Sequence, residues 1–218
     1  MTTTSGSSVQ DPRIRRSRSA LIEATVTLVA ERGTAAVPLS DIAEAAGVSR
    51  PVVYQHFGDR ETLLLESAVD LATRELLPRM AAVGNSLFIR DGALALVQHF
   101  AEHRAFYRAV LTSSCAFALN KALTGLLIPV NRQLVQKMFG GVLDAQGEED
   151  FALFLTGGGA AFVNTWVVEG ADPLDPEQFT DRLVRLVGAT GAMLVPSAAT
   201  SAAATAAATK KHNKEPEL

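Results

Sequence analysis

The chain has 218 residues with a formal net charge of −3, and 48% of them are hydrophobic but only 6% aromatic. The negative charge argues against nonspecific coating of nucleic acid, and a single cysteine excludes an intramolecular disulfide, which fits a reducing cytoplasm. Alanine, leucine and valine are expected to form most of the core, and the chain shows no sustained alternation of apolar and polar residues. We therefore expect an all-α protein of about nine helices. We expect a cytoplasmic protein without membrane contact, because we find neither an apolar run of about eighteen residues nor an apolar signal-peptide core.

The first residues are rich in Ser, Thr and Gly, and a basic cluster follows them. Arg13, Arg15, Arg16 and Arg18 stand together with no acidic residue among them. Such a cluster is either a solvated arm or a phosphate-binding segment, and its place before a DNA-binding motif favours the second. We expect four parts: an arm over 1–12, a helix-turn-helix over 13–60, a helical domain over 61–195 and a tail over 196–218.

Residues 39–60 carry the most informative pattern. Apolar residues at three- and four-residue steps predict a short helix with one buried face: Leu39, Ile42, Ala43 and Ala46. Gly47 supplies the permissive backbone that ends this helix. Ser49 is expected to cap a second helix with its side chain, and Pro51 suits that helix's first turn.

In this second helix, Val53 and Phe57 lie four residues apart and form the expected buried stripe. The opposite face is predicted to be exposed: Arg50, Pro51, Val52, Tyr54, Gln55 and His56. Two short helices joined in this way predict a helix-turn-helix whose second helix enters a DNA major groove.

Over residues 14–66 the pattern resembles the DNA-binding domain of the TetR family. The resemblance rests on Leu21-Ile22, Ala24, Leu28, Glu31–Gly33, Ile42-Ala43, Ala46–Ser49, Val53-Tyr54, His56-Phe57, Asp59–Glu61 and Leu64. It covers under a third of the chain. Thr25, Val29 and Arg60 depart from the family's usual Ala, Phe and Lys, and Val37-Pro38 stands where the family often has Thr or Ser.

Arg50 is the leading candidate for reading a base, since an arginine there can donate two hydrogen bonds to guanine, although phosphate contact alone is the alternative. Pro51 and Val52 would meet thymine methyls or fill the groove, while Gln55 reaches a base or nothing. The resemblance implies phosphate contacts for Tyr54, His56 and Arg60, and a packing role for His56 is equally open. The expected DNA-binding set is Arg15, Arg18, Ser49, Arg50, Pro51, Val52, Tyr54, Gln55, His56 and Arg60.

A longer helix should begin after an Asp59 cap and end near Leu77, before Pro78. Because it would leave the DNA-binding domain and enter the next one, it is the natural lever between them. Further helices are expected at about 91–111, 114–127, 129–139, 148–168 and 176–194, the last capped by Asp175.

The second half carries softer signals. His99, His103 and Tyr107 share one helix face at steps of four residues. Three interpretations are open. The two histidines could bind zinc, although the sequence offers no third ligand; the three residues could line a pocket; or the face could be an ordinary half-exposed one. The sequence fixes no metal site, and no cofactor is expected. Cys115 lies in an apolar run, so a small buried residue is preferred over a redox sensor.

Three consecutive glycines, Gly157–Gly159, interrupt an otherwise apolar helical segment, which suggests close approach of another backbone or a kink beside a ligand. The aromatic residues of the same helical segment are expected to lie either in the core or along a ligand cavity. TetR-like proteins pair as homodimers through their last two long helices, so the resemblance implies a dimer interface made of Phe154, Gly158, Phe162, Leu183, Leu186 and Val187.

The function expected from the resemblance is a ligand-responsive transcriptional regulator, a repressor that binds a palindromic operator as a dimer. A small apolar or amphipathic effector would release it, from a site that includes His103, Tyr107, Cys115, Phe162 and Trp166. One alternative is a DNA-binding regulator that has no small-molecule ligand and is controlled by a protein partner. An enzyme is not expected, because we find no Gly-rich phosphate loop, Ser-His-Asp arrangement or paired carboxylates in an apolar setting.

Overall fold

The computed structural model describes residues 12–83 and 89–194, whose regular structure is helical apart from one isolated bridge between Gly140 and Leu143. This confirms the expected all-α class. The helices are α1 Pro12–Arg32, α2 Leu39–Ala45, α3 Arg50–Phe57, α4 Arg60–Leu71, α5 Leu77–Val83, α6 Ile89–Glu102, α7 Arg104–Leu111, α8 Ala116–Phe139, α9 Ala145–Glu169 and α10 Pro176–Leu194. A π-helical turn, η1 Ala72–Leu76, joins α4 to α5. The expected tail over 196–218 and all but the last residue of the arm over 1–12 lie outside the described residues.

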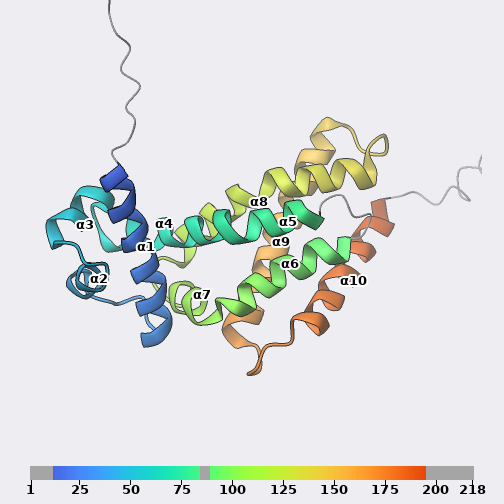
Figure 1. Ribbon diagram of the computed structural model, residues 1–218. Helices are drawn as coiled ribbons and strands as arrows, with labels where there is room; N and C mark the ends of the chain where they lie inside the picture. Colours follow the sequence, from blue (N-terminus) through green and yellow to red (C-terminus); the bar gives the residue numbers. More distant parts are fainter. Residues whose placement is uncertain (1–11, 84–88, 195–218) are drawn as a thin grey trace, which may run out of the picture.

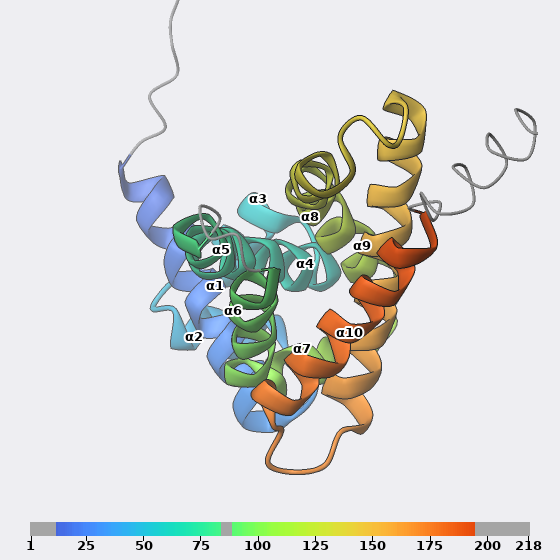
Figure 2. The ribbon, with the colours of Figure 1, turned by 90° about the vertical axis from the view of Figure 1, so that its right-hand side faces the viewer.

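The helices α1, α2 and α3 form one end of the molecule, and α4 leads from them into the body (Figure 1). There α4 packs on α1 and α8, while α1 also contacts α7. On the far side, α9 packs on α8 and α7, and α10 lies against α6, as the view in Figure 2 shows. The end formed by α1, α2 and α3 therefore contacts the body through both α1 and α4.

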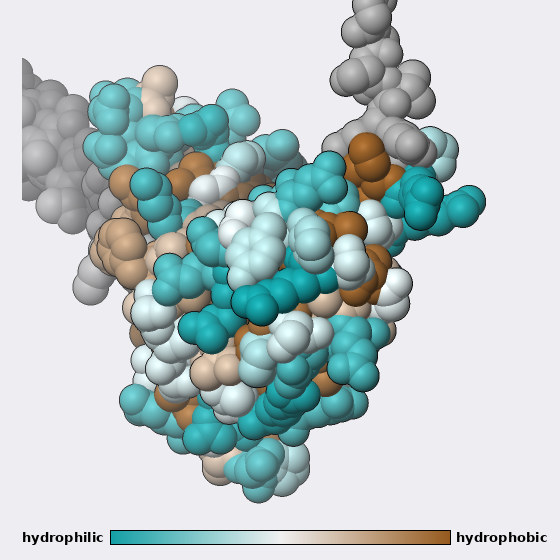
Figure 3. All heavy atoms as spheres, turned by 90° about the vertical axis from the view of Figure 1, so that its left-hand side faces the viewer, coloured by the Kyte–Doolittle hydropathy of each residue, from teal (hydrophilic) through white to brown (hydrophobic). Residues whose placement is uncertain are grey.

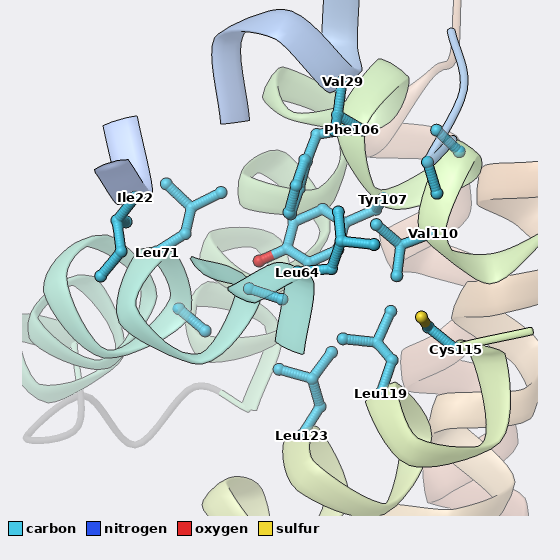
Figure 4. Close-up of a cluster of buried hydrophobic side chains, with 14 of the residues drawn as sticks. Ile22, Val29, Leu64, Leu71, Phe106, Tyr107, Val110, Cys115, Leu119 and Leu123 are labelled. Atoms are coloured by element: carbon cyan, nitrogen blue, oxygen red, sulfur yellow. The ribbon is translucent and has the colours of Figure 1, made fainter. Parts of the chain in front are cut away.

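One continuous hydrophobic core runs through both halves. It extends from Leu21 in α1 to Phe179 in α10. Figure 4 shows its centre, where Leu64 of α4, Tyr107 of α7 and Leu119 of α8 lie together, each no more than 1% exposed. Because interiors pack as densely as organic crystals, a displacement of α4 is felt by the helices on either side of it.

The prediction that the linking helix ends before Pro78 is wrong, since the helical path continues through η1 to Val83. Proline usually stops a helix because its ring clashes with the carbonyl of the fourth residue before it. Here Leu77 donates its N–H to the carbonyl of Ala72, five residues earlier, so the turn just before Pro78 is widened. This wider turn accommodates the ring.

Two other helix boundaries also differ from expectation. The helix expected over 91–111 is divided at His103 into α6 and α7. Conversely, α8 is a single helix that contains Pro129, where a break was expected. Both Pro129 and Gly125, whose carbonyl loses its helical partner, are exposed, so water can replace the lost hydrogen bond while the opposite face of α8 stays packed.

Side-chain caps fix several helix starts. The carboxylate of Asp59 accepts from the Thr62 N–H at 2.7 Å, and that of Asp175 accepts from the Gln178 N–H at 3.0 Å, as predicted. The prediction for Ser49 is wrong in part: it occupies the N-cap position of α3 with extended backbone, but its side chain makes no capping hydrogen bond. Its hydroxyl remains on the exposed surface at the helix N-terminus.

Helix α9 corrects the statement that no apolar run is long enough to cross a membrane. Residues Ala145–Glu169 meet that criterion by length and composition, with a mean hydropathy of 1.5, and only 28% of the apolar window is buried. Length and hydropathy alone are weak evidence for a membrane span. The combination does show that α9 leaves much apolar surface uncovered.

Candidate nucleic-acid interface

The turn between α2 and α3 sets the orientation of α3 relative to α2. Gly47 follows α2 with φ of 65°, a left-handed conformation that glycine adopts without steric cost. Ile42 of α2 and Val53 and Phe57 of α3 are at most 4% exposed and join the core of α1 and α4. The apolar stripes predicted from the sequence are therefore the faces that hold the motif together.

The opposite face of α3 points into solvent. Arg50, Pro51, Tyr54 and Gln55 are exposed, and Val52 and His56 are half-buried. This end of the molecule is mostly hydrophilic (Figure 3). Arg50 donates from its guanidinium to the Tyr54 hydroxyl at 3.1 Å, and its Cζ lies 5.6 Å from the centre of the Tyr54 ring. The two side chains thus form one unit, which limits the rotamers of Arg50 before any contact with DNA.

His56 connects α3 to α1. Its Nε2 lies 2.9 Å from the Ser17 Oγ, within hydrogen-bonding distance, and its ring is tilted against Phe57. The structure therefore places His56 where the packing interpretation expects it. A phosphate contact there stays a prediction.

The basic residues of α1 and α4 have different surroundings. Arg18 forms an ion pair with Glu66 and lies 5.4 Å from the Phe57 ring centre, so it also holds α1 against α3 and α4. Arg15 is exposed in the first turns of α1, and Arg60 is exposed at the first residue of α4. Of these three expected phosphate ligands, Arg15 and Arg60 are the more accessible.

A second exposed surface lies on α9, far from α3. We call it the α9 stripe; it is a row of exposed residues at helical spacing: Leu153, Phe154, Gly157, Gly158, Ala161 and Thr165. Leu153 and Phe154 are 54% and 61% exposed. A Cβ added to Gly157, Gly158 or Gly159 would meet nothing within 4 Å, so none of the helices within residues 12–83 and 89–194 makes the close approach that the glycines permit.

Sequence reasoning missed Leu153, because nearly every position of α9 is apolar and periodicity cannot separate its faces. On the neighbouring helix α10, Leu186 is 51% exposed, and Leu183 and Val187 are half-buried. Phe162 is also half-buried, and its ring stacks on Phe179 with centres 4.7 Å apart.

The residues expected to bind an effector lie in several places. Tyr107 and Cys115 are buried in the core, and Trp166 stacks on Phe179 at 4.4 Å. His103 is within 2.7 Å of the Glu75 carboxylate. Cys115 also borders a hollow of about 320 Å³ lined by residues 33–36, 60–61, 64, 109 and 112–115, where the helix-turn-helix meets the α7–α8 connection.

Two short helices joined by a tight turn, the second with a buried apolar stripe and an exposed polar face, define a helix-turn-helix motif. Residues 21–67 match the family model described as bacterial regulatory proteins, tetR family. This part of the chain is therefore a DNA-binding domain of the TetR type.

Two curated relatives are transcriptional regulators by name. BetI of Rhizobium meliloti is 32% identical over 81 residues, which cover 37% of this chain and 40% of that protein. EthR of Mycobacterium tuberculosis is 28% identical over 123 residues, which cover 50% of this chain and 57% of EthR. The matched region therefore spans about half the length of these relatives.

Solved structures share the fold over most of the chain. A TetR-family regulator from Rhodococcus sp. superposes with a TM-score of 0.60 at 19% identity, covering 80% of this chain and 98% of that one. FadR of Thermus thermophilus, a TetR-family repressor solved with lauroyl-CoA, gives a TM-score of 0.57 at 20% identity and covers 78% and 92%. At these identities the agreement concerns the fold.

Proposed function

We propose that this protein is a transcriptional repressor that binds a palindromic operator as a homodimer and is released by a small apolar or amphipathic effector. The observation that carries the proposal is the exposed face of α3. There Arg50, Tyr54 and Gln55 stand in solvent while Val53 and Phe57 fix the helix on the core. This is the arrangement that a recognition helix needs in a major groove.

Phosphate contacts would position α3. Arg15 and Arg60 are exposed on the two helices that flank it, and the uncapped hydroxyl of Ser49 lies at its N-terminus. Helix N-termini attract phosphate through their free N–H groups and their dipole. These contacts supply affinity and orientation, and Arg50 supplies base selection.

The α9 stripe supports a homodimer. Exposed apolar surface of this extent marks an interaction site, and the glycines and Ala161 allow another helix to approach closely. A second copy of the chain fits, because two-fold symmetry brings the same stripe of each subunit together. It would also place two α3 helices on successive turns of DNA, as a palindromic operator requires.

Effector control would act through α4. This helix shares the core with α1 on one side and with α8 on the other, so a ligand between the body helices can displace the recognition helices. An apolar or amphipathic ligand suits the aliphatic and aromatic residues that make up that body. A TetR-family repressor of similar fold was solved in complex with lauroyl-CoA, which supports a ligand of this kind.

The testing experiment measures binding of the purified protein to the DNA that flanks its own gene, across a salt series, beside an unrelated fragment of equal length. We expect selective binding with an even number of chains per site. Equal and steeply salt-dependent binding to both fragments would show only nonspecific phosphate attraction. That result, repeated with fragments from the rest of the genome, would contradict the proposal.

A regulator without a small-molecule ligand is the second candidate, and the packing of the expected effector residues favours it. Tyr107 is fully buried in the core, and Trp166 is stacked on Phe179, so both already have partners. Thermal unfolding with a panel of fatty acids and acyl-CoA thioesters separates the two candidates. A concentration-dependent rise in Tm with weaker operator binding supports the effector, and no change across the panel supports control by a partner protein.

A further inference from the structure

Four polar side chains lie close together where η1 packs against α6, at the start of α7. Glu75 comes from η1, His99 from α6, His103 from the break between α6 and α7, and Tyr107 from α7. The His103 Nε2 lies 2.7 Å from the Glu75 Oε2, and the His99 Nε2 lies 2.9 Å from the Tyr107 hydroxyl. One possible ligand atom from each of Glu75, His99 and His103 lies within 4.8 Å of the other two.

His99 presents a buried atom without a partner. Its side chain is 0% exposed, and its Nδ1 has no hydrogen-bond partner among the described residues. Buried polar atoms nearly always have a hydrogen-bond partner, so one without a partner needs an explanation, and an ion is among the usual ones. Tyr107 already engages Nε2, which leaves Nδ1 as the nitrogen that can accept a ligand without breaking a hydrogen bond.

Two arginines near the carboxylate oppose a cation. Arg74 lies 3.8 Å from the Glu75 Oε1, and Arg79 lies 4.0 Å from its Oε2. Arg79 has a closer partner, the Glu102 carboxylate at 2.7 Å, and Arg74 is also within reach of Glu23 and Asp70. Both guanidiniums are partly exposed, so water and these other carboxylates screen them.

We propose that Glu75, His99 and His103 bind a divalent transition metal ion of the zinc type. Two imidazole nitrogens and one carboxylate oxygen are a ligand set that zinc takes, with a water molecule in the fourth position. Tetrahedral geometry at zinc bond lengths puts ligand atoms about 3.3 Å apart, so no pair of ligand atoms, all within 4.8 Å of one another, has to approach by more than about 1.5 Å on binding. The Tyr107 hydroxyl then accepts from the His99 Nε2–H and orients the ring, a typical support for a ligating histidine.

The place of the site gives it a consequence for regulation. Glu75 belongs to the helix that starts at the DNA-binding motif, whereas both histidines belong to the α6–α7 segment next to it (Figure 1). The π-helical turn that carries Glu75 is a feature often found at functional sites. A bound metal would clamp the linking helix to the body, and its effect on operator affinity rests on the proposed function.

The test starts with the metal-free, full-length protein and needs no DNA. Zn²⁺ is titrated against a chromophoric chelator, and Co²⁺ binding is followed by visible absorption. We expect one equivalent per chain and the intense d–d bands of a tetrahedral centre. Glu75→Gln and His103→Gln should each weaken Zn²⁺ binding by more than about tenfold. Circular dichroism would verify that both variants are folded, which their partial exposure favours.

Matched controls keep the result specific. Glu102→Gln removes a neighbouring carboxylate outside the cluster, and His56→Gln removes a histidine from α3. Both should bind Zn²⁺ as the parent does. Absence of stoichiometric binding by the parent, or equal weakening by Glu102→Gln and Glu75→Gln, overturns the proposal.

A second arm separates this proposal from the proposed function. Operator affinity is compared with and without Zn²⁺ for the parent and for Glu75→Gln. A metal-dependent change in the parent alone supports coupling between the site and DNA. Metal binding by a protein that never binds operator DNA would keep the metal site and reject the repressor, and unchanged operator affinity would reject the coupling alone.

Discussion

Helices α3 and α9 each leave one face in solvent, but the two faces differ in chemistry. On α3 the exposed residues include Arg50, Tyr54 and Gln55, which carry hydrogen-bonding groups. On α9 the middle of the exposed stripe is made of Leu153, Phe154, Gly157, Gly158 and Ala161, whose side chains carry none. A polar face with arginine gains by meeting phosphate and base edges, whereas an apolar face with small residues gains by excluding water against another helix. The chemistry of each exposed face, and not its exposure alone, therefore indicates which kind of partner it suits.

The largest expected effect comes from placing a charge on the α9 stripe. In the proposed homodimer, Phe154→Glu would bury a carboxylate at the subunit interface, and two-fold symmetry doubles its cost of several kcal/mol. We expect the dimer to dissociate at micromolar concentration, with loss of operator binding. Light scattering and DNA binding would measure both changes.

Phe117→Glu is the matched control, because Phe117 lies at the start of α8, outside the α9 stripe, and is 81% exposed. It should leave the dimer intact. If Phe154→Glu remains a dimer at the same concentration, then the α9 stripe is not the subunit interface.

The two faces of α3 can be separated by a pair of substitutions. Phe57 is 4% exposed and Tyr54 is 45% exposed. Phe57→Ala should lower the free energy of unfolding by about 3–5 kcal/mol through the cavity it leaves, whereas Tyr54→Ala should change it by about 0.5 kcal/mol or less. Urea denaturation of both variants measures the difference, and similar losses would mean that α3 is seated differently.

Arg50→Ala addresses base reading by the exposed face. We expect operator affinity to fall by about 1–3 kcal/mol, or about 5- to 150-fold, with folding and dimerisation unchanged. Anisotropy titrations with operator and with random DNA would show whether the loss is specific. An equal loss on both DNAs would reduce Arg50 to a phosphate contact.

The smallest effect concerns the start of α4, the helix that links the two regions. Asp59→Ala removes the cap on the Thr62 N–H and should cost about 0.5–2 kcal/mol of stability. Hydrogen bonds from the backbone and the side chain of Thr62 lower the pKa of Asp59, so its stabilisation is present above the unfolded value near 3.8 and is lost as pH falls below it. Denaturation of both proteins at pH 7 and pH 3 should show the difference shrinking at the lower pH.

The sequence predicted best those features that depend on near neighbours. The stripe of Val53 and Phe57 and the caps at Asp59 and Asp175 involve residues within four positions of each other, and the structure contains all of them. The outcome at Pro78 and Pro129 was not predictable in the same way. Whether proline ends a helix there depends on the widened turn at η1 and on which side of α8 faces water.

The possible metal ligands show the same limit more sharply. His99 and His103 could be paired from their spacing, but Glu75 lies 28 residues before His103, on a helix that periodicity alone could not align with them. A third ligand from a distant element becomes visible only when the fold brings the helices together. Leu153 was missed for the opposite reason, because α9 has too many apolar residues for its exposed side to stand out.

The shared core also affects how the molecule folds and unfolds. Leu21 of α1, Leu64 of α4, Tyr107 of α7 and Leu119 of α8 contribute to one cluster, although they come from distant segments of the chain. A chain cut after α3 would lose the partners of Leu21 and Phe57, and its three helices would be left with a small core of their own. Melting in a calorimeter should therefore show a single cooperative transition, with no separate step for the helix-turn-helix.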